Sequence, residues 1–171
     1  SMCSPTRACL LTGRNAHAVG MGIIAEWSTG FPGYRGRITR RAATLAEILR
    51  DHAYNTLAVG KWHLTPLAEA TAAGPFADWP LARGFDRWYG FHGALTDQWN
   101  PELFEDNHAI DVAGDGYHLS QDLVDRAIGF VRDQQSVAPE KPFFLYVAFG
   151  ACHWPHHVPR PYMEKYRGRY D

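Results

Sequence analysis

The stretch that decides the fold lies near the start of the chain: Cys3-Ser4-Pro5-Thr6-Arg7-Ala8-Cys9-Leu10-Leu11-Thr12-Gly13-Arg14. Ser4 is a residue type that caps helices, and Pro5 suits the first helical position, where its missing N–H costs little. The following residues favour a helix, and Gly13 suits its end. We therefore expect a helix that begins directly after Cys3. The main-chain N–H groups at such a helix start attract anions.

Further along the chain, the apolar pattern predicts helices and strands in alternation. Helices are expected at 42–52, with Leu45, Ile48 and Leu49 at core spacing, and at 119–133, which carries an apolar stripe. Two apolar runs are interpreted as strands: 56–59 as a buried strand and 143–149 as a central strand of the sheet. Helix and strand alternation is typical of an α/β fold, here with a mainly parallel central sheet flanked by helices.

Two segments show no sustained period. Residues 20–36 are rich in Gly, Pro and aromatic residues and are predicted to form a loop. Residues 65–118 contain many Gly, Pro, Trp and His residues. We expect irregular active-site loops in this second segment and not a second domain.

Composition excludes several classes of protein. The chain has 171 residues, of which 46% are hydrophobic, enough for a real core. A net charge of −1 argues against a general nucleic-acid-binding protein. The sequence has no run of about eighteen consecutive apolar residues, the length that a membrane-spanning helix needs.

Charge is distributed unevenly. Residues 1–41 hold six arginines and one acid, Glu26. Guanidinium groups match the oxygens of sulfate and phosphate, so this part of the chain is a candidate anion site. A solvated basic surface is the alternative interpretation of the same charges.

The three cysteines are Cys3, Cys9 and Cys152, and their spacing fits neither a disulfide framework nor a zinc site. Cys9 and Cys152 lie in apolar surroundings, so we expect them to be small core residues. Cys3 is different because of its place at a helix start, where a nucleophile, a redox centre or no function at all are open interpretations.

Reactive side chains follow both predicted strands. The first strand runs into Gly60-Lys61-Trp62-His63 and the second into Gly150-Ala151-Cys152-His153. In extended backbone Lys61 and His63 point to the same side. Open α/β sheets bind ligands beyond the carboxyl ends of their strands, so these side chains are expected to meet Cys3 at one pocket. Cations there would neutralise the oxygens of an anionic ester while a histidine protonates the leaving group.

Three segments together resemble the formylglycine-dependent (type I) sulfatases, an arylsulfatase-like family of the alkaline phosphatase superfamily. The segment from Cys3 to Arg14 is similar to the first sulfatase signature, Cys-x-Pro-x-Arg followed by Leu-Thr-Gly-Arg. Residues 53–63 resemble the second signature, and 151–155 resemble the family's third segment, which contains a histidine. The motifs occur in the family's order.

This resemblance implies a role for each candidate residue. Cys3 would be converted to formylglycine by a maturation enzyme, and Arg7 would support that group. Lys61 would contact sulfate oxygens, and His63 would assist deprotonation of the hydrated aldehyde. His153 would protonate the leaving oxygen. The implied substrate is a carbohydrate or aryl sulfate ester.

The resemblance also implies a divalent cation, usually calcium, of which Cys3 as formylglycine would be one ligand. The other ligands are expected outside this chain. We therefore expect residues 1–171 to be a partial sulfatase catalytic domain that lacks an N-terminal strand and a C-terminal portion, and that is inactive alone. The compartment is left open among cytoplasmic, periplasmic and secreted.

Three alternatives to a sulfatase are left open by the sequence. One is a phosphonate or phosphodiester hydrolase of the same superfamily, since sulfate and phosphate esters share a tetrahedral shape. Another is a non-catalytic protein on the sulfatase scaffold. The third is a cysteine hydrolase that uses Cys3 as a thiolate with His153, which leaves Lys61 and His63 without a role.

Overall fold

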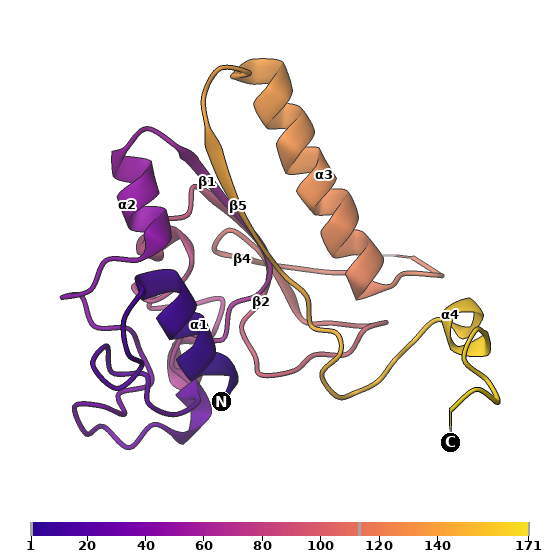
Figure 1. The fold of residues 1–171 in the computed structure, drawn as a ribbon, viewed down its shortest axis with the longest axis horizontal. Helices are drawn as coiled ribbons and strands as arrows, with labels where there is room; N and C mark the ends of the chain where they lie inside the picture. Colours follow the sequence, from indigo (N-terminus) through magenta and orange to yellow (C-terminus); the bar gives the residue numbers. More distant parts are fainter. Residues whose placement is uncertain (1, 113, 171) are drawn as a thin grey trace.

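The computed structural model describes residues 2–112 and 114–170, and within them five strands form one sheet in the order β4-β3-β2-β1-β5 (Figure 1). The strands are β1 (Asn55–Lys61), β2 (Arg87–Phe91), β3 (Leu103–Glu105), β4 (His108–Ile110) and β5 (Phe143–Ala148). The α-helices are α1 (Cys3–Thr12), α2 (Leu45–Asp51), α3 (Leu119–Val137) and α4 (Arg160–Glu164). Short 3-10 helices are η1 (Ala25–Trp27), η2 (Leu67–Glu69) and η3 (Leu81–Arg83).

Helices cover both faces of the sheet, with α1 and α2 on one side and α3 on the other (Figure 1). Side chains alternate along β1, so Ala58 belongs to the core under α1 and α2 while Leu57 and Val59 belong to the core under α3. The sheet is therefore the middle layer of three, and its strand ends lie beside the start of α1.

The predicted α/β class is confirmed. Strand β1 pairs in parallel with β2 on one side and with β5 on the other, whereas β3 and β4 are antiparallel additions at the far edge. The runs 56–59 and 143–149 correspond to β1 and β5, and the helix expected at 119–133 lies within α3. The central position expected for 143–149 was wrong, because β5 lies at the edge of the described sheet and most of its residues are only half-buried or exposed.

The expectation that 65–118 is irregular was wrong, because this segment contributes β2, β3 and β4. Two of these strands have only three residues each, too few for an alternating pattern to stand out. The third, β2, is buried along most of its length between helices of both layers, so its pattern does not alternate either.

The helix boundaries differ in part from the prediction. Cys3 is itself the first residue of α1, and the Ser4 hydroxyl accepts a hydrogen bond from the Ala25 N–H (3.3 Å) instead of capping the helix. Gly13 ends α1 with φ +65°, as predicted. Helix α2 begins after Thr44, whose side chain forms a capping box with Glu47.

Several residues expected in the core lie at the surface. Leu45 and Ile48 of α2 are exposed, whereas Ala46 is buried there. Cys9 and Cys152 are also exposed, so their assignment as core residues was wrong. Cys9 lies on the outer side of α1, and Cys152 lies in the turn after β5, where the apolar run has already ended.

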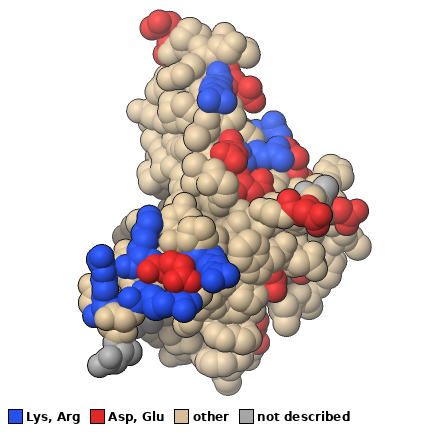
Figure 2. Space-filling view, turned by 90° about the vertical axis from the view of Figure 1, so that its right-hand side faces the viewer, with Lys and Arg blue, Asp and Glu red and all other residues tan. Residues whose placement is uncertain are grey.

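The C-terminal part of the chain extends away from the layers. Residues 160–170 are exposed, and Glu164 of α4 forms ion pairs with Arg160 and Arg167. Figure 2 faces this end of the molecule and shows Lys and Arg side chains gathered around an acidic group. Among the described residues, no helix has the length and apolar character to cross a membrane.

Candidate active site

Cys3 lies at the N-terminus of α1, beside the end of the edge strand β5. An open cavity of about 540 Å³ lies between the two elements. Its walls are Met2, Cys3, Thr6, Arg7 and Leu10 from the start of the chain, and Tyr146, Val147, Ala148, Phe149 and Ala151 from β5 and the turn after it. The first turn of α1 has unpaired N–H groups, and a cavity at this place suits an anionic ligand.

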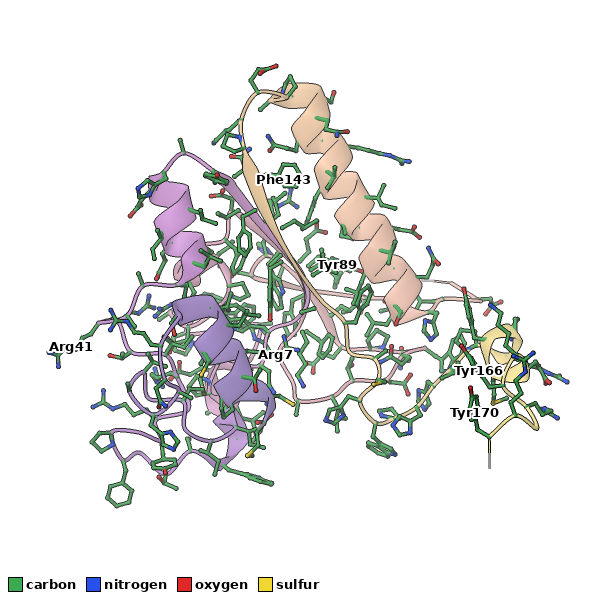
Figure 3. The ribbon with its side chains drawn as sticks, viewed as in Figure 1. Arg7, Arg41, Tyr89, Phe143, Tyr166 and Tyr170 are labelled. Carbon is green, nitrogen blue, oxygen red and sulfur yellow. The ribbon has the colours of Figure 1, made fainter. Side chains whose placement is uncertain are left out.

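Arg7 lines this cavity and joins α1 to strands β1 and β5. Its Nη1 donates hydrogen bonds to the main-chain oxygen of Lys61 (2.7 Å) and to the hydroxyl of Tyr146 (2.9 Å). Figure 3 shows Arg7 between α1 and the sheet. Burial raises the pKa of the Tyr146 hydroxyl, and the Arg7 charge opposes that rise. Arg7 thus positions β1 and β5 relative to the helix of Cys3.

Lys61 is the last residue of β1, and it is buried. Its Nζ donates a hydrogen bond to the main-chain oxygen of Ala94. Burial lowers the pKa of Lys61, the neighbouring Cys3 raises it, and the neighbouring charge of Arg7 lowers it. The side chains of Cys3 and Arg7 therefore lie close enough to the ammonium group of Lys61 to influence its pKa.

His63 is buried with an exposed fraction of 1%, and its Nε2 lies 2.7 Å and 2.9 Å from the two carboxylate oxygens of Glu26. Burial lowers the pKa of the imidazole, while Glu26 acts in the opposite direction. The backbone of His63 has φ +56°, so the extended geometry expected through Lys61-Trp62-His63 ends before His63. Lys61 nevertheless lies close enough to lower the pKa of His63.

His153 lies in the turn after β5 and is exposed. Its N–H donates to the Gly150 oxygen (3.0 Å), and its Nδ1 lies 2.7 Å from the oxygen of Trp154. Ala151 of the same turn lines the cavity of Cys3. The structure thus brings Lys61 and His63 near Arg7 and places His153 on the surface of the adjoining turn. Of the candidate residues only Cys3 and Arg7 line the cavity itself, so the expectation that all of them meet in one pocket was wrong.

Sequence reasoning did not assign Glu26 or Tyr146 to the site. Glu26 was visible as the one acid among six arginines in residues 1–41, which was the available signal. Tyr146 is an ordinary aromatic residue of a buried strand by sequence, and only its contact with Arg7 marks it.

The residues of this chain do not form a complete cation site. Within 2–112 and 114–170, no group of three or more His, Cys, Asp and Glu side chains is placed to hold a metal ion. A hard cation such as calcium needs about six oxygen ligands. Calcium binding, with Cys3 as one ligand after modification, therefore stays a prediction.

Solved structures with the same arrangement of sheet and helices define the class. The structure of Ps i-CgsB matches with a TM-score of 0.80 and 24% identity, over 99% of this chain and 39% of that one. BT4656, solved with D-glucosamine-2-N,6-O-disulfate, matches with a TM-score of 0.68 and 24% identity, over 96% of this chain and 28% of that one. The fold is that of the alkaline-phosphatase-like class of α/β proteins to which sulfatases belong.

Sequence comparison then gives the family. The model of the family described as Sulfatase matches residues 1–171, and the chain belongs to the sulfatase family. An uncharacterised sulfatase of Schizosaccharomyces pombe is 33% identical, over 100% of this chain and 33% of its own length. The arylsulfatase of Klebsiella aerogenes is 32% identical, over 99% of this chain and 37% of its own. The chain thus spans about a third of the length of these relatives.

Proposed function

We propose that the parent protein hydrolyses sulfate monoesters with a nucleophile derived from Cys3. The parent protein means this chain with the further sequence that the family resemblance predicts. One observation carries the proposal: Cys3 begins α1 in a cavity that Arg7 also lines, and the buried ammonium of Lys61 neighbours both. A nucleophile beside two cations suits attack on an ester that bears negative charge.

The position of Cys3 also fits its conversion to formylglycine. As first residue of α1, its side chain stands at the helix start and lines the open cavity, so a hydrated aldehyde there has room and N–H groups nearby. One hydroxyl of that hydrate would displace the alcohol from sulfur, and loss of the second hydroxyl's proton would then release sulfate and restore the aldehyde.

The chain's own residues supply charge and proton transfer to this reaction. Arg7 and Lys61 offset the negative charge on the non-bridging oxygens and at position 3. His63, neutral because burial lowers its pKa, accepts the proton that leaves the second hydroxyl. His153 donates a proton to the departing alcohol from the turn beside the cavity. No step is assigned to calcium, because the described residues do not complete a site for it.

Sulfated carbohydrates are the substrate class that the relatives favour. BT4656 was solved with a disulfated glucosamine, and one relative is named N-acetylgalactosamine-6-sulfatase. The human form of the latter is 29% identical over 99% of this chain. We extend this substrate class, together with aryl sulfates, to the parent protein as part of the proposal.

The test is the intact mass of the peptide that contains Cys3, in parent protein co-expressed with a formylglycine-generating enzyme. It is paired with turnover of an aryl sulfate and of a phosphonate ester, each with and without calcium. We expect an aldehyde mass, and sulfate release that Cys3→Ala abolishes. Cys9→Ala is the matched control, because Cys9 is an exposed residue of the same helix and should leave turnover unchanged.

The other outcomes separate the alternatives. Turnover of the phosphonate ester in preference to the sulfate would assign the protein to the phosphonate and phosphodiester hydrolases. An unmodified thiol with turnover would indicate a cysteine hydrolase. An unmodified thiol without turnover would support a non-catalytic protein on the sulfatase scaffold.

A further inference from the structure

The partly exposed carboxylate of Glu26 pairs with the buried ring of His63, although the two residues are far apart in sequence. Both carboxylate oxygens of Glu26 lie within hydrogen-bond distance of one ring nitrogen, Nε2, at 2.7 Å and 2.9 Å. The other ring nitrogen, Nδ1, is buried and has no hydrogen-bond partner among the described residues. Nε2 of the His63 ring is thus paired with Glu26, and Nδ1 has no partner among the described residues.

This geometry fixes which nitrogen carries the proton. Burial raises the pKa of Glu26, but its hydrogen bonds with His63 and the main chain together keep that pKa below the ordinary value. The carboxylate is therefore ionised and only accepts hydrogen bonds, so Nε2 must carry the hydrogen. In the neutral ring, Nδ1 is then the nitrogen with the free lone pair.

Glu26 is itself held against the helix of the nucleophile. It lies in η1, whose first residue, Ala25, donates its N–H to the hydroxyl of Ser4 (3.3 Å). Ser4 is fully buried and directly follows Cys3. The hydrogen bond between Ala25 and Ser4 therefore links the position of the Glu26 carboxylate to the position of Cys3.

We propose that Glu26 is the positioning residue for His63: it holds the ring with hydrogen on Nε2 and presents Nδ1 as the proton acceptor. The tautomer and orientation stand on the geometry alone. The consequence for catalysis rests on the proposed function, because it requires His63 to accept a proton during sulfate release.

The first experiment observes the tautomer directly and needs no activity. Nitrogen-15 NMR of the parent protein with labelled histidine side chains, assigned with a His63→Gln variant, distinguishes the protonated nitrogen from the free one. We expect the Nε2–H form for His63. In Glu26→Leu, which removes the acceptor, that preference should be lost, while Glu26→Asp should retain part of it. A wild-type ring with hydrogen on Nδ1 would overturn the proposal.

Glu69→Leu is the matched control for these variants. Glu69 is also a partly exposed glutamate in a 3-10 helix, and it pairs with Arg37 (2.5 Å) instead of with a candidate site residue. The His63 signals should be the same in Glu69→Leu as in wild type. Equal changes in Glu69→Leu and Glu26→Leu would mean that the tautomer reports general loosening of the fold, which contradicts the proposal.

The second experiment compares kcat with KM for an aryl sulfate. For histidines that bind metals, loss of the hydrogen-bond partner that orients the ring typically costs about 10- to 100-fold in activity. We expect that loss in kcat for Glu26→Leu, with KM changed by less than about threefold and with partial recovery in Glu26→Asp. Unchanged kcat in Glu26→Leu would overturn the catalytic consequence. If the wild-type parent has no sulfatase activity but shows the expected tautomer, the proposed function fails and the positioning of His63 stands.

Discussion

The guanidinium of Arg7 donates a 2.7 Å hydrogen bond to the main-chain carbonyl of Lys61, so the helix that begins with Cys3 also holds the end of strand β1. The same Nη1 donates to the hydroxyl of Tyr146 on β5. One side chain therefore sets the spacing among a helix and two strands. Arg7 therefore contributes to the shape of the cavity as well as to its positive charge.

The first prediction concerns Arg7→Lys, which keeps the charge and removes the planar group that reaches both acceptors. We expect kcat/KM for an aryl sulfate to fall by about 10- to 100-fold, because Lys61 and Tyr146 lose their common donor. The free energy of unfolding should fall by about 2 kcal/mol. Kinetics and urea unfolding of the parent protein measure the two effects. Arg14→Lys, at an exposed position after the same helix, should change neither quantity.

The second prediction concerns Gly60→Ala in β1. Gly60 has φ +94°, and a Cβ there would lie 1.9 Å from the main-chain oxygen of Ala148 in β5. Backbone strain alone costs about 1–3 kcal/mol, and the contact adds to it by separating the strands. We expect a loss of at least about 3 kcal/mol in the free energy of unfolding, together with loss of turnover, since Lys61 is the next residue.

Gly129→Ala is the control for that substitution. Gly129 lies in α3, and a Cβ there meets no atom within 4 Å. Alanine favours a helix over glycine by about 0.5–1 kcal/mol, so this variant should be slightly more stable than wild type. Equal destabilisation by the two substitutions would contradict the close approach of β1 and β5.

The third prediction is an acid-dependent loss of stability caused by His92. Burial among Trp79, Trp88 and Phe104 lowers the pKa of His92 to about 3, and neither ring nitrogen has a partner among the described residues. The unfolded chain binds this proton near pH 6.5, so the folded state loses stability as the pH falls from about 6.5 to about 3, by up to about 1.4 kcal/mol per pH unit. Above pH 6.5 the ring is neutral in both states and contributes no pH dependence.

Urea unfolding of wild type and His92→Phe at pH 7, 6, 5 and 4 measures this contribution, with pH values chosen to lie on both sides of the ordinary histidine pKa of about 6.5. Other titrating groups are common to the two proteins and cancel in the difference. The stability of wild type relative to the variant should fall steadily below pH 6.5. A difference that does not vary with pH would show that the ring is not buried in its neutral form.

The fourth prediction concerns Arg83, a buried arginine in η3. Its Nη2 donates to the Ala42 oxygen (2.9 Å), and its Nε lies 3.4 Å from a carboxylate oxygen of Glu47. Arg83→Met removes the donor to Ala42 and the cation beside Glu47, while Glu47 keeps its hydrogen bond from the Thr44 N–H, so we expect a loss of about 1–3 kcal/mol from the unpaired Ala42 oxygen. Thermal unfolding should show the loss, whereas Arg132→Met, at an exposed position of α3, should change stability by less than about 0.5 kcal/mol.

The sequence was sufficient for the parts of the fold that are locally encoded. Strands β1 and β5 are apolar runs bounded by polar or turn residues, and α3 has a long apolar stripe, so each was predictable. Strands β2, β3 and β4 were missed because their pairing with neighbours, and not their own pattern, makes them strands. The exposure of Leu45 and Ile48 was missed for a similar reason, since packing determines which side of a short helix is buried.

The candidate site likewise contains residues that a sequence motif predicts and residues that only the structure identifies. Cys3, Arg7, Lys61 and His63 belong to continuous motifs, and the structure brings them together. Glu26 reaches His63 across 37 positions of sequence, and Tyr146 reaches Arg7 across 139. No local pattern encodes contacts of that range. The motifs therefore predict the candidate catalytic residues, and the structure adds the residues that bind to them.

The order of the strands has a consequence for the chain during its synthesis. Strand β1 has a neighbouring strand on each side, yet its partner β5 is made only after 81 further residues, from Trp62 to Pro142. Until β5 leaves the ribosome, one edge of β1 has no strand beside it and Arg7 has no Tyr146 to bind. Long-range pairing of this kind is slow and leaves apolar edges open to chaperones and to aggregation. The cavity around Cys3 is consequently among the last parts of this chain to take its final shape.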